Sequence, residues 1–143
     1  MGRGASKISS GGFSTSLVQE TVYHGTNNPN ITSFNTSGRE SNGAIFFADD
    51  PDYAEEEAYI KNENYGGEQT IYDVKLNIQN PTTVTLKAGD FGDPIKERKY
   101  IENAKKEGFD SVIFKETGNP VSNSTFYAVF SPKQVKILKK NKL

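Results

Sequence analysis

The only histidine of the chain, His24, stands in the stretch TVYHGTNNPN, directly before Gly25 and Thr26. An imidazole can accept or donate a hydrogen bond and titrates near neutral pH, so its position raises the question of a ligand site. A simpler interpretation is an imidazole that is hydrogen-bonded within a turn, with Gly25 providing an unusual backbone conformation. The residue types alone leave both interpretations open.

The composition excludes several other chemistries. The 143 residues include no cysteine, so there is no disulfide framework and no thiolate chemistry. With one histidine, a zinc site would need carboxylates for nearly all its ligands, and we expect no metal. The formal net charge of −1 gives no general reason to expect nucleic acid, although the end KQVKILKKNKL is locally basic and is interpreted as solvating the chain end. Because no apolar run could span a membrane or serve as a secretory signal, we expect a cytoplasmic protein without a membrane partner.

The chain divides by composition into an arm and a domain. Residues 1–17 are rich in Gly and Ser and poor in apolar side chains, which predicts a flexible arm. Residues 18–143 are long enough for one domain with a single hydrophobic core.

The elements that must position His24 begin with two β-prone segments, ETVYHG and GAIFFA. The polar loop between them, residues 26–42, has a length that is commonly functional. After the second strand, DDPDYAEEEAYIKNE predicts a helix with Asp49 or Asp50 as N-cap and Pro51 in its first turn.

The rest of the chain predicts a sheet and one more helix. The alternation in QTIYDVKLNI (69–78) predicts a half-buried strand, and TTVTLKA continues the sheet. The second helix begins at Asp93 and Pro94 and ends before Gly108 at its C′ position. SVIFK, FYAVF and QVKIL are three further strands. About seven strands and two helices that do not alternate strictly favour an α+β fold.

In their order and spacing, YHGT, GAIFFADDPDYAEEEAY and FYAVFSPKQVKIL resemble the ADP-ribosyltransferase superfamily. The similarity is greatest to the His-Tyr-Glu branch, which includes poly-ADP-ribose polymerases, diphtheria toxin and many phage and bacterial toxin domains. That branch has a His-Gly-Thr-like strand end, then G-x-Y-F-A, a helix, and a late strand of the type E-Y-x-V-F-x-P-x-Q-I. The resemblance spans residues 21–138 and implies two small, mostly antiparallel sheets that form a split cleft for NAD.

The resemblance also implies roles for individual residues. The backbone N–H and C=O of Gly25 would clamp the nicotinamide carboxamide, and His24 would hold a ribose hydroxyl. An aromatic ring should stack on the cationic nicotinamide, with Tyr53 or Tyr59 as candidates. The implied NAD-binding residues are His24, Gly25, Thr26, Phe46, Tyr53 and Tyr59.

The sequence departs from the His-Tyr-Glu signature at two of its three positions. Alignment of the motifs places Phe46 at the tyrosine and Phe126 at the glutamate, so the catalytic set reads His24, Phe46, Phe126. The second change removes the charge that would steady the developing sugar cation. A polar residue from a neighbouring loop could substitute, and the candidates are Ser124, Thr125, Glu116 and Glu63.

Three functions follow from this departure. The expected one is transfer of a single ADP-ribose from NAD to a protein or nucleic-acid acceptor, with a host protein favoured, and with release of nicotinamide. Polymer extension is not expected, because nothing at Phe126 would activate an acceptor ribose. The alternatives are a catalytically silent module that binds NAD or ADP-ribose, and a protein-interaction module whose pocket is filled by Phe126. The Gly/Ser-rich start also resembles segments of phage structural proteins, which implies a viral or prophage origin and action in the host cytoplasm.

Overall fold

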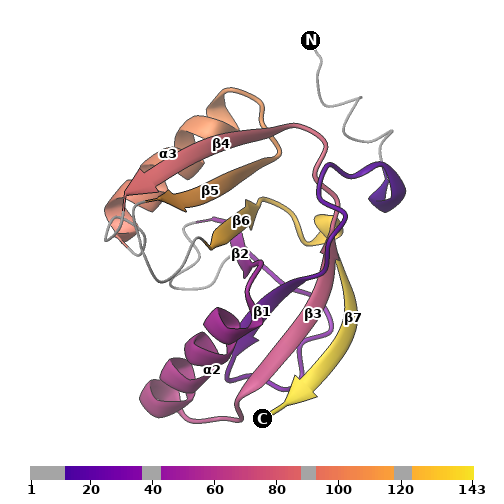
Figure 1. Cartoon of the computed structure of the whole chain (residues 1–143), viewed down its shortest axis with the longest axis vertical. Coiled ribbons are helices and arrows are strands. Elements are labelled where there is room, and N and C mark those ends of the chain that lie inside the picture. The colour runs from indigo at the N-terminus through magenta and orange to yellow at the C-terminus, as the bar shows by residue number, and fades with distance from the viewer. Residues whose placement is uncertain (1–11, 37–42, 88–92, 118–123) are drawn as a thin grey trace.

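The computed structural model describes residues 12–36, 43–87, 93–117 and 124–143, which form seven strands, two α-helices and two short 3-10 helices (Figure 1). All seven strands belong to one sheet in the order β4-β5-β6-β2-β1-β3-β7. Neighbours are antiparallel except for β4 and β5, which are parallel and connected through α3. The predicted α+β class is confirmed. The elements are η1 (Phe13–Thr15), β1 (Val22–Thr26), β2 (Ile45–Ala48), α2 (Pro51–Tyr65), β3 (Thr70–Leu76), β4 (Pro81–Lys87), α3 (Pro94–Lys106), β5 (Ser111–Thr117), β6 (Thr125–Val129), η2 (Pro132–Gln134) and β7 (Val135–Lys142).

The sheet consists of two halves that meet at a narrow junction. One half contains β4, β5, β6 and β2, and the other contains β1, β3 and β7. A single register pair, Tyr23 with Ala48, joins β1 to β2, whereas β1 and β3 are joined by five pairs. The two small sheets that we expected are therefore the two halves of one continuous hydrogen-bonded sheet. The strands of the two halves diverge beyond the junction.

Both helices begin where an aspartate caps them. The Asp50 carboxylate accepts a hydrogen bond from the N–H of Asp52, and the Asp93 carboxylate accepts from Ile95, which satisfies N–H groups that the helix itself leaves unpaired. Asp50 is thus the N-cap of α2, while the carboxylate of Asp49 accepts from the N–H of Thr125 on β6. At the other end of α3, Gly108 has a positive φ of 87° and occupies the predicted C′ position.

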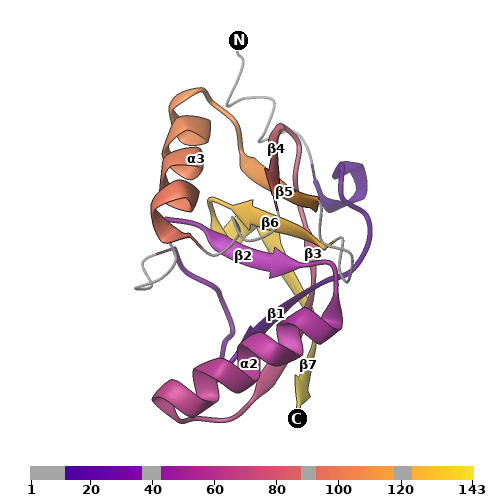
Figure 2. The same ribbon diagram turned by 60° about the vertical axis from the view of Figure 1, so that its left-hand side comes forward.

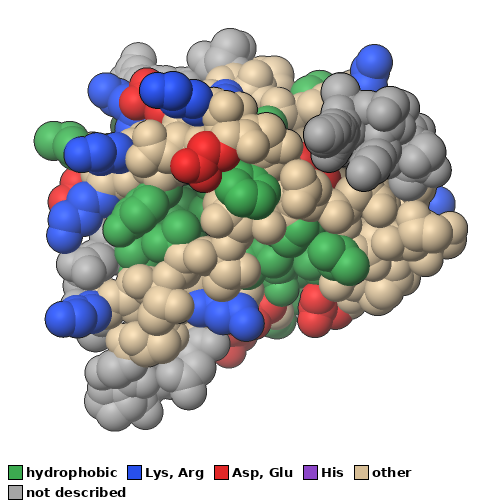
Figure 3. Space-filling model, turned by 90° about the horizontal axis from the view of Figure 1, so that it is seen from above, with side chains coloured by type: hydrophobic (Ala, Val, Ile, Leu, Met, Phe, Trp, Pro, Cys, Tyr) green, Lys and Arg blue, Asp and Glu red, His purple; other side chains and the backbone are tan. Residues whose placement is uncertain are grey.

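The helices lie on the same face of the sheet, each over a different half. α2 packs on β1 and β3, and α3 packs on β5 (Figure 2). α3 also carries exposed basic residues, and the view from above shows Lys and Arg side chains gathered along the left-hand edge (Figure 3). Helix α2 is predominantly acidic, so the two helices present opposite charges.

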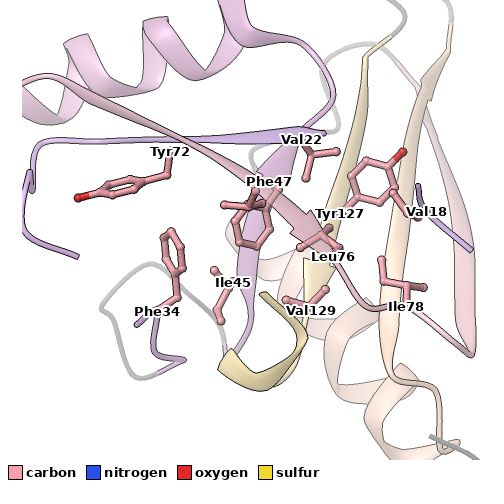
Figure 4. Close-up of a cluster of buried hydrophobic side chains, with 11 residues drawn as sticks. Val18, Val22, Phe34, Ile45, Phe47, Tyr72, Leu76, Ile78, Tyr127 and Val129 are labelled. Atoms are coloured by element: carbon pink, nitrogen blue, oxygen red, sulfur yellow. The ribbon is translucent and has the colours of Figure 1, made fainter. Parts of the chain in front are cut away.

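Alternation along the strands divides the core between the two faces. On β2, Phe46 and Ala48 pack with the core beneath α3, whereas Ile45 and Phe47 pack with the core on the opposite face. That opposite cluster is shown in Figure 4. It contains Val18, Val22, Phe34, Ile45, Phe47, Tyr72, Val74, Leu76, Ile78, Tyr127 and Val129.

The glutamine of the FSPKQ motif, Gln134, connects the two halves of the sheet through hydrogen bonds of its buried side chain. Gln134 is only 8% exposed, and its side-chain oxygen accepts from the N–H groups of Phe130 and Ser131, each at 3.0 Å. Its amide nitrogen donates to the carbonyl oxygens of Asn77 (3.2 Å) and Asp110 (3.0 Å). One buried side chain therefore connects the turn after β6, the segment after β3 and the segment before β5.

Residues near both ends of the chain contact β3 or the segment that follows it. Part of the predicted arm, residues 1–11, lies outside the described residues, but Ser16 is buried and its hydroxyl accepts from the N–H of Ile78 at 2.9 Å. This contact attaches the last residues of the predicted arm to the segment after β3. The lysine-rich end forms strand β7 up to Lys142, at the outer edge of the sheet, where lysines oppose pairing with other strands. Within the described ranges, no helix has the length and apolar character needed to cross a membrane.

Candidate functional site

A cavity of about 1020 Å³ opens where β1 and β2 diverge, between α2 and α3. Its walls come from β1, β2, the loop after β1, one face of α2, the start of α3 and, on β6, Phe126, the residue at the predicted glutamate position. The predicted long loop thus borders the cavity over residues 27–35, while its residues 37–42 lie outside the described part of the chain. Of the residues predicted to bind NAD, those at the cavity are His24, Gly25, Thr26, Phe46 and Tyr53.

His24 lies within strand β1 and not in a turn, which corrects the simpler of the two initial interpretations. The side chain is half-buried, and its Nδ1 lies 2.7 Å from the carbonyl oxygen of Phe46 on β2. Phe34 contacts the imidazole edge-on at 4.8 Å between ring centroids, and Phe47 contacts it at 5.5 Å. The ring is therefore held from two strands and the loop.

This environment fixes the protonation of His24. Burial lowers its pKa from 6.5 to about 3, and the positive charge of Lys61 acts in the same direction, against the smaller opposing effect of the Phe46 carbonyl. The imidazole is therefore neutral at physiological pH. Because a carbonyl oxygen can only accept, the single ring proton lies on Nδ1 and Nε2 is left as an acceptor.

Gly25 is required by helix packing, a reason that the sequence did not reveal. A Cβ on this residue would lie 1.8 Å from the carbonyl oxygen of Ala54 and 3.0 Å from the nitrogen of Ala58, so α2 sits directly on the strand. Gly25 is not among the described glycines with positive φ, and no unusual dihedral explains it. Its carbonyl oxygen accepts a 2.9 Å hydrogen bond from the Lys61 ammonium, which occupies one of the oxygen's two lone pairs.

The aromatic residues of the predicted site do not all reach the cavity. Phe46 borders it and stacks on Phe114 at 6.4 Å. Tyr53 borders it as well and contacts Phe126 edge-on at 4.7 Å, with Phe126 only 3% exposed. Tyr59 is 52% exposed and lines a separate shallow hollow on another face of α2. The structure therefore separates the two candidate stacking tyrosines and leaves Tyr53 at the cavity.

None of the four residues proposed to replace the missing glutamate borders the cavity. The carbonyl oxygen of Ser124, the residue before β6, accepts from the N–H of Glu116 on β5 at 3.3 Å, and Glu63 is exposed on α2. Thr125 is the first residue of β6. Its carbonyl oxygen accepts from the N–H of Asp49, and its own N–H donates to the Asp49 carboxylate.

Carboxylates and cations that the sequence analysis missed do border the cavity: Glu57 and Lys61 on α2, and Glu97 and Arg98 on α3. The spacing of Tyr53, Glu57 and Lys61 at intervals of four residues could have shown that they share one face of the predicted helix. Phe34 was also missed. It is the only aromatic residue of a polar loop, and that loop is pinned because the Tyr72 hydroxyl donates to the Asn28 carbonyl and accepts from the N–H of Ile31.

A split α+β sheet with a His-Gly strand end at its cleft is the arrangement expected of the ADP-ribosyltransferase superfamily. The model of one of its families, described as ADP-ribosyltransferase in polyvalent proteins, matches residues 19–143, and the chain belongs to that family. No curated protein matches the chain. The predicted superfamily is thereby confirmed. Membership supports a transferase whose substrate is NAD.

Proposed function

We propose that the chain binds NAD in this cavity and transfers one ADP-ribose unit to a protein or nucleic-acid acceptor, with release of nicotinamide. The observation that carries the proposal is the neutral His24 at the cavity wall, whose proton is fixed on Nδ1 by Phe46. Nε2 is then an acceptor near neutral pH, suited to a ribose hydroxyl.

The cavity has the size and the chemistry for NAD. Its volume lies at the upper end of the range for ligand pockets, as an extended dinucleotide requires. Lys61 and Arg98 are the basic side chains among the described residues at its wall, and they offer favourable charge for a diphosphate. The rings of Phe46 and Tyr53 provide faces for a cationic nicotinamide. These features support NAD as the occupant.

A second candidate, a module that binds NAD without reaction, is favoured by one observation. Phe126 holds the position of the usual glutamate and is packed against Tyr53, so β6 contributes no carboxylate to the cavity. The proposed acceptor lies in the host cytoplasm and receives single ADP-ribose units.

The test uses purified protein with NAD labelled in the adenylate portion. We expect binding by calorimetry, release of nicotinamide, and label on the protein itself or on a protein of the lysate. His24→Ala should weaken NAD binding and label transfer while circular dichroism stays unchanged. Binding without nicotinamide release would favour the silent module, and absence of binding would favour the protein-interaction module.

A further inference from the structure

Three consecutive glutamates on α2 face two different surfaces. Glu57 is half-buried and borders the large cavity, whereas Glu55 and Glu56 are exposed and line the shallow hollow on the other side of the helix. The helix therefore directs one carboxylate of the three toward the His24 strand. The two others provide matched controls of the same charge and helix position.

The turn that carries Glu57 is pressed against the strand end. The backbone of Ala54 and Ala58 lies over Gly25 so closely that no Cβ would fit there. Lys61, one turn after Glu57, reaches the Gly25 carbonyl at 2.9 Å. A side chain at position 57 thus starts beside the backbone that is proposed to hold nicotinamide.

Tyr53 links Glu57 to the position of the missing glutamate. Tyr53 lies one helical turn before Glu57, and the Glu57 carboxylate acts on its hydroxyl, while the Tyr53 ring contacts Phe126 at 4.7 Å between ring centroids. Burial and the nearby carboxylates, Glu57 first among them, raise the pKa of Tyr53, so its hydroxyl stays protonated and remains a donor. Tyr53, Glu57 and Phe126 all border the cavity, so Glu57 belongs to the same wall cluster as the residue at the glutamate position.

We propose that Glu57 is the carboxylate that stabilises the developing ribosyl cation, supplied by helix α2 because β6 carries Phe126. The inference rests on the proposed function. In the reaction, the bond between ribose C1′ and the nicotinamide nitrogen breaks, and its electron pair leaves with that nitrogen to give neutral nicotinamide. The electron-poor C1′ then takes an electron pair from the acceptor atom, whose proton passes to Glu57 and on to solvent. With water as the acceptor, the products are nicotinamide, ADP-ribose and a proton.

Glu97 on α3 is the other carboxylate at the described cavity wall. Its charge raises the pKa of the Tyr53 hydroxyl less than Glu57 does. α3 packs on β5, which β6 and β2 separate from β1 in the sheet. The position of Glu57 on the helical turn that packs on Gly25, and its influence on Tyr53, therefore favour Glu57.

The experiment compares Glu57→Gln with Glu56→Gln and Glu97→Gln, each an isosteric loss of one charge. For each variant, NAD affinity is measured by calorimetry and nicotinamide release by single-turnover kinetics. We expect Glu57→Gln to lower the rate about 100-fold or more, as loss of one group that stabilises transition-state charge does, with the Kd changed less than about threefold. Glu56→Gln should match the wild type. Glu57→Asp, which keeps the charge on a shorter stem, should recover part of the rate.

The outcomes separate this inference from the function on which it rests. An active wild type with an equally active Glu57→Gln overturns the role of Glu57 and leaves the transferase intact. If only Glu97→Gln lowers the rate of nicotinamide release, the role of Glu57 is overturned and Glu97 of α3 takes its place. A wild type that binds NAD without releasing nicotinamide, or does not bind it, overturns both. Thermal melts confirm that each variant is folded.

Discussion

The Nδ1 atom of His24 lies 2.7 Å from the carbonyl oxygen of Phe46, so the only imidazole of the chain joins β1 to β2 beside the junction of the two sheet halves. Together with the backbone pairing of Tyr23 and Ala48, this side-chain hydrogen bond connects β1 to β2. The same bond sets the tautomer of the ring. A structural tie and a ligand-binding acceptor are thus combined in one side chain.

The protonation of His24 can be observed directly, because its ring signals are the only imidazole signals of the protein. With a pKa near 3, its Hε1 chemical shift should stay constant between pH 8 and about pH 4.5. A two-dimensional NMR titration measures this. A midpoint near 6.5 would show that the ring is solvated and that its tautomer is not fixed.

The same shift gives a sign for the pH dependence of stability. The folded-state pKa is lower than the unfolded value of 6.5, so as the pH falls the unfolded chain binds the proton first. Stability from the neutral ring is complete above pH 6.5 and is lost as the pH falls toward 3, by at most about 1.4 kcal/mol per pH unit. Urea unfolding at pH 7 and pH 5 should show a larger loss for the wild type than for His24→Asn.

Two amide substitutions separate the two functions of the ring. In His24→Asn, the amide can still donate near Nδ1, so stability should be retained while NAD affinity falls about two- to tenfold, the value of one hydrogen bond. His24→Gln places its amide near Nε2, so we expect the reverse pattern, with partial affinity and a loss of stability. Urea unfolding and calorimetry provide both readouts. Equal effects of the two variants would argue against a divided role.

Gly25→Ala tests the contact between α2 and β1. The new methyl group would overlap the carbonyl of Ala54, so α2 must shift, and we expect a loss of about 1 to 3 kcal/mol in the free energy of unfolding. NAD turnover should fall as well, because the helix carries Glu57 and Lys61. Gly12→Ala is the control, since no atom lies within 4 Å of its Cβ position. A wild-type melting temperature for Gly25→Ala would contradict the close packing.

Gln134→Ala removes the side chain whose hydrogen bonds connect the two halves of the sheet. Its partners are two N–H and two carbonyl groups, and leaving them unpaired should cost about 2 to 4 kcal/mol. The neighbouring Lys133→Ala, at an exposed position, should unfold like the wild type. Chemical denaturation measures both variants. If the two behave alike, the buried amide is not a significant tie.

The elements were predictable where local chemistry determines them. Asp50 and Pro51, and Asp93 and Pro94, start helices by a mechanism that is visible in a few residues, and alternation identified β3. The strand order was not predictable from local signals, because β2 pairs with β6 about eighty residues later in the chain.

The site was predictable only as far as its motifs extend. His24, Gly25 and Phe46 were found from the motifs, but the reason for Gly25 depends on how closely α2 approaches, which no strand pattern contains. For the same reason, the sequence suggested Glu63, and not Glu57, as a replacement for the missing glutamate. Both lie on the predicted helix, and only the tertiary packing shows which face of α2 meets the cavity.

The strand order also determines when this protein can fold. β6 lies between β5 and β2, and β7 completes the outer edge of β3, so residues 125–142 are needed by both halves of the sheet. During synthesis, β2 has only its single pair with β1 until β6 is made, and Phe47 and Phe114 lack the strand between them. Long-range pairings of this kind slow folding and leave apolar strand edges exposed in the meantime. A nascent chain that stops before Thr125 is therefore expected to be bound by chaperones or to aggregate, rather than to hold a partly formed cleft.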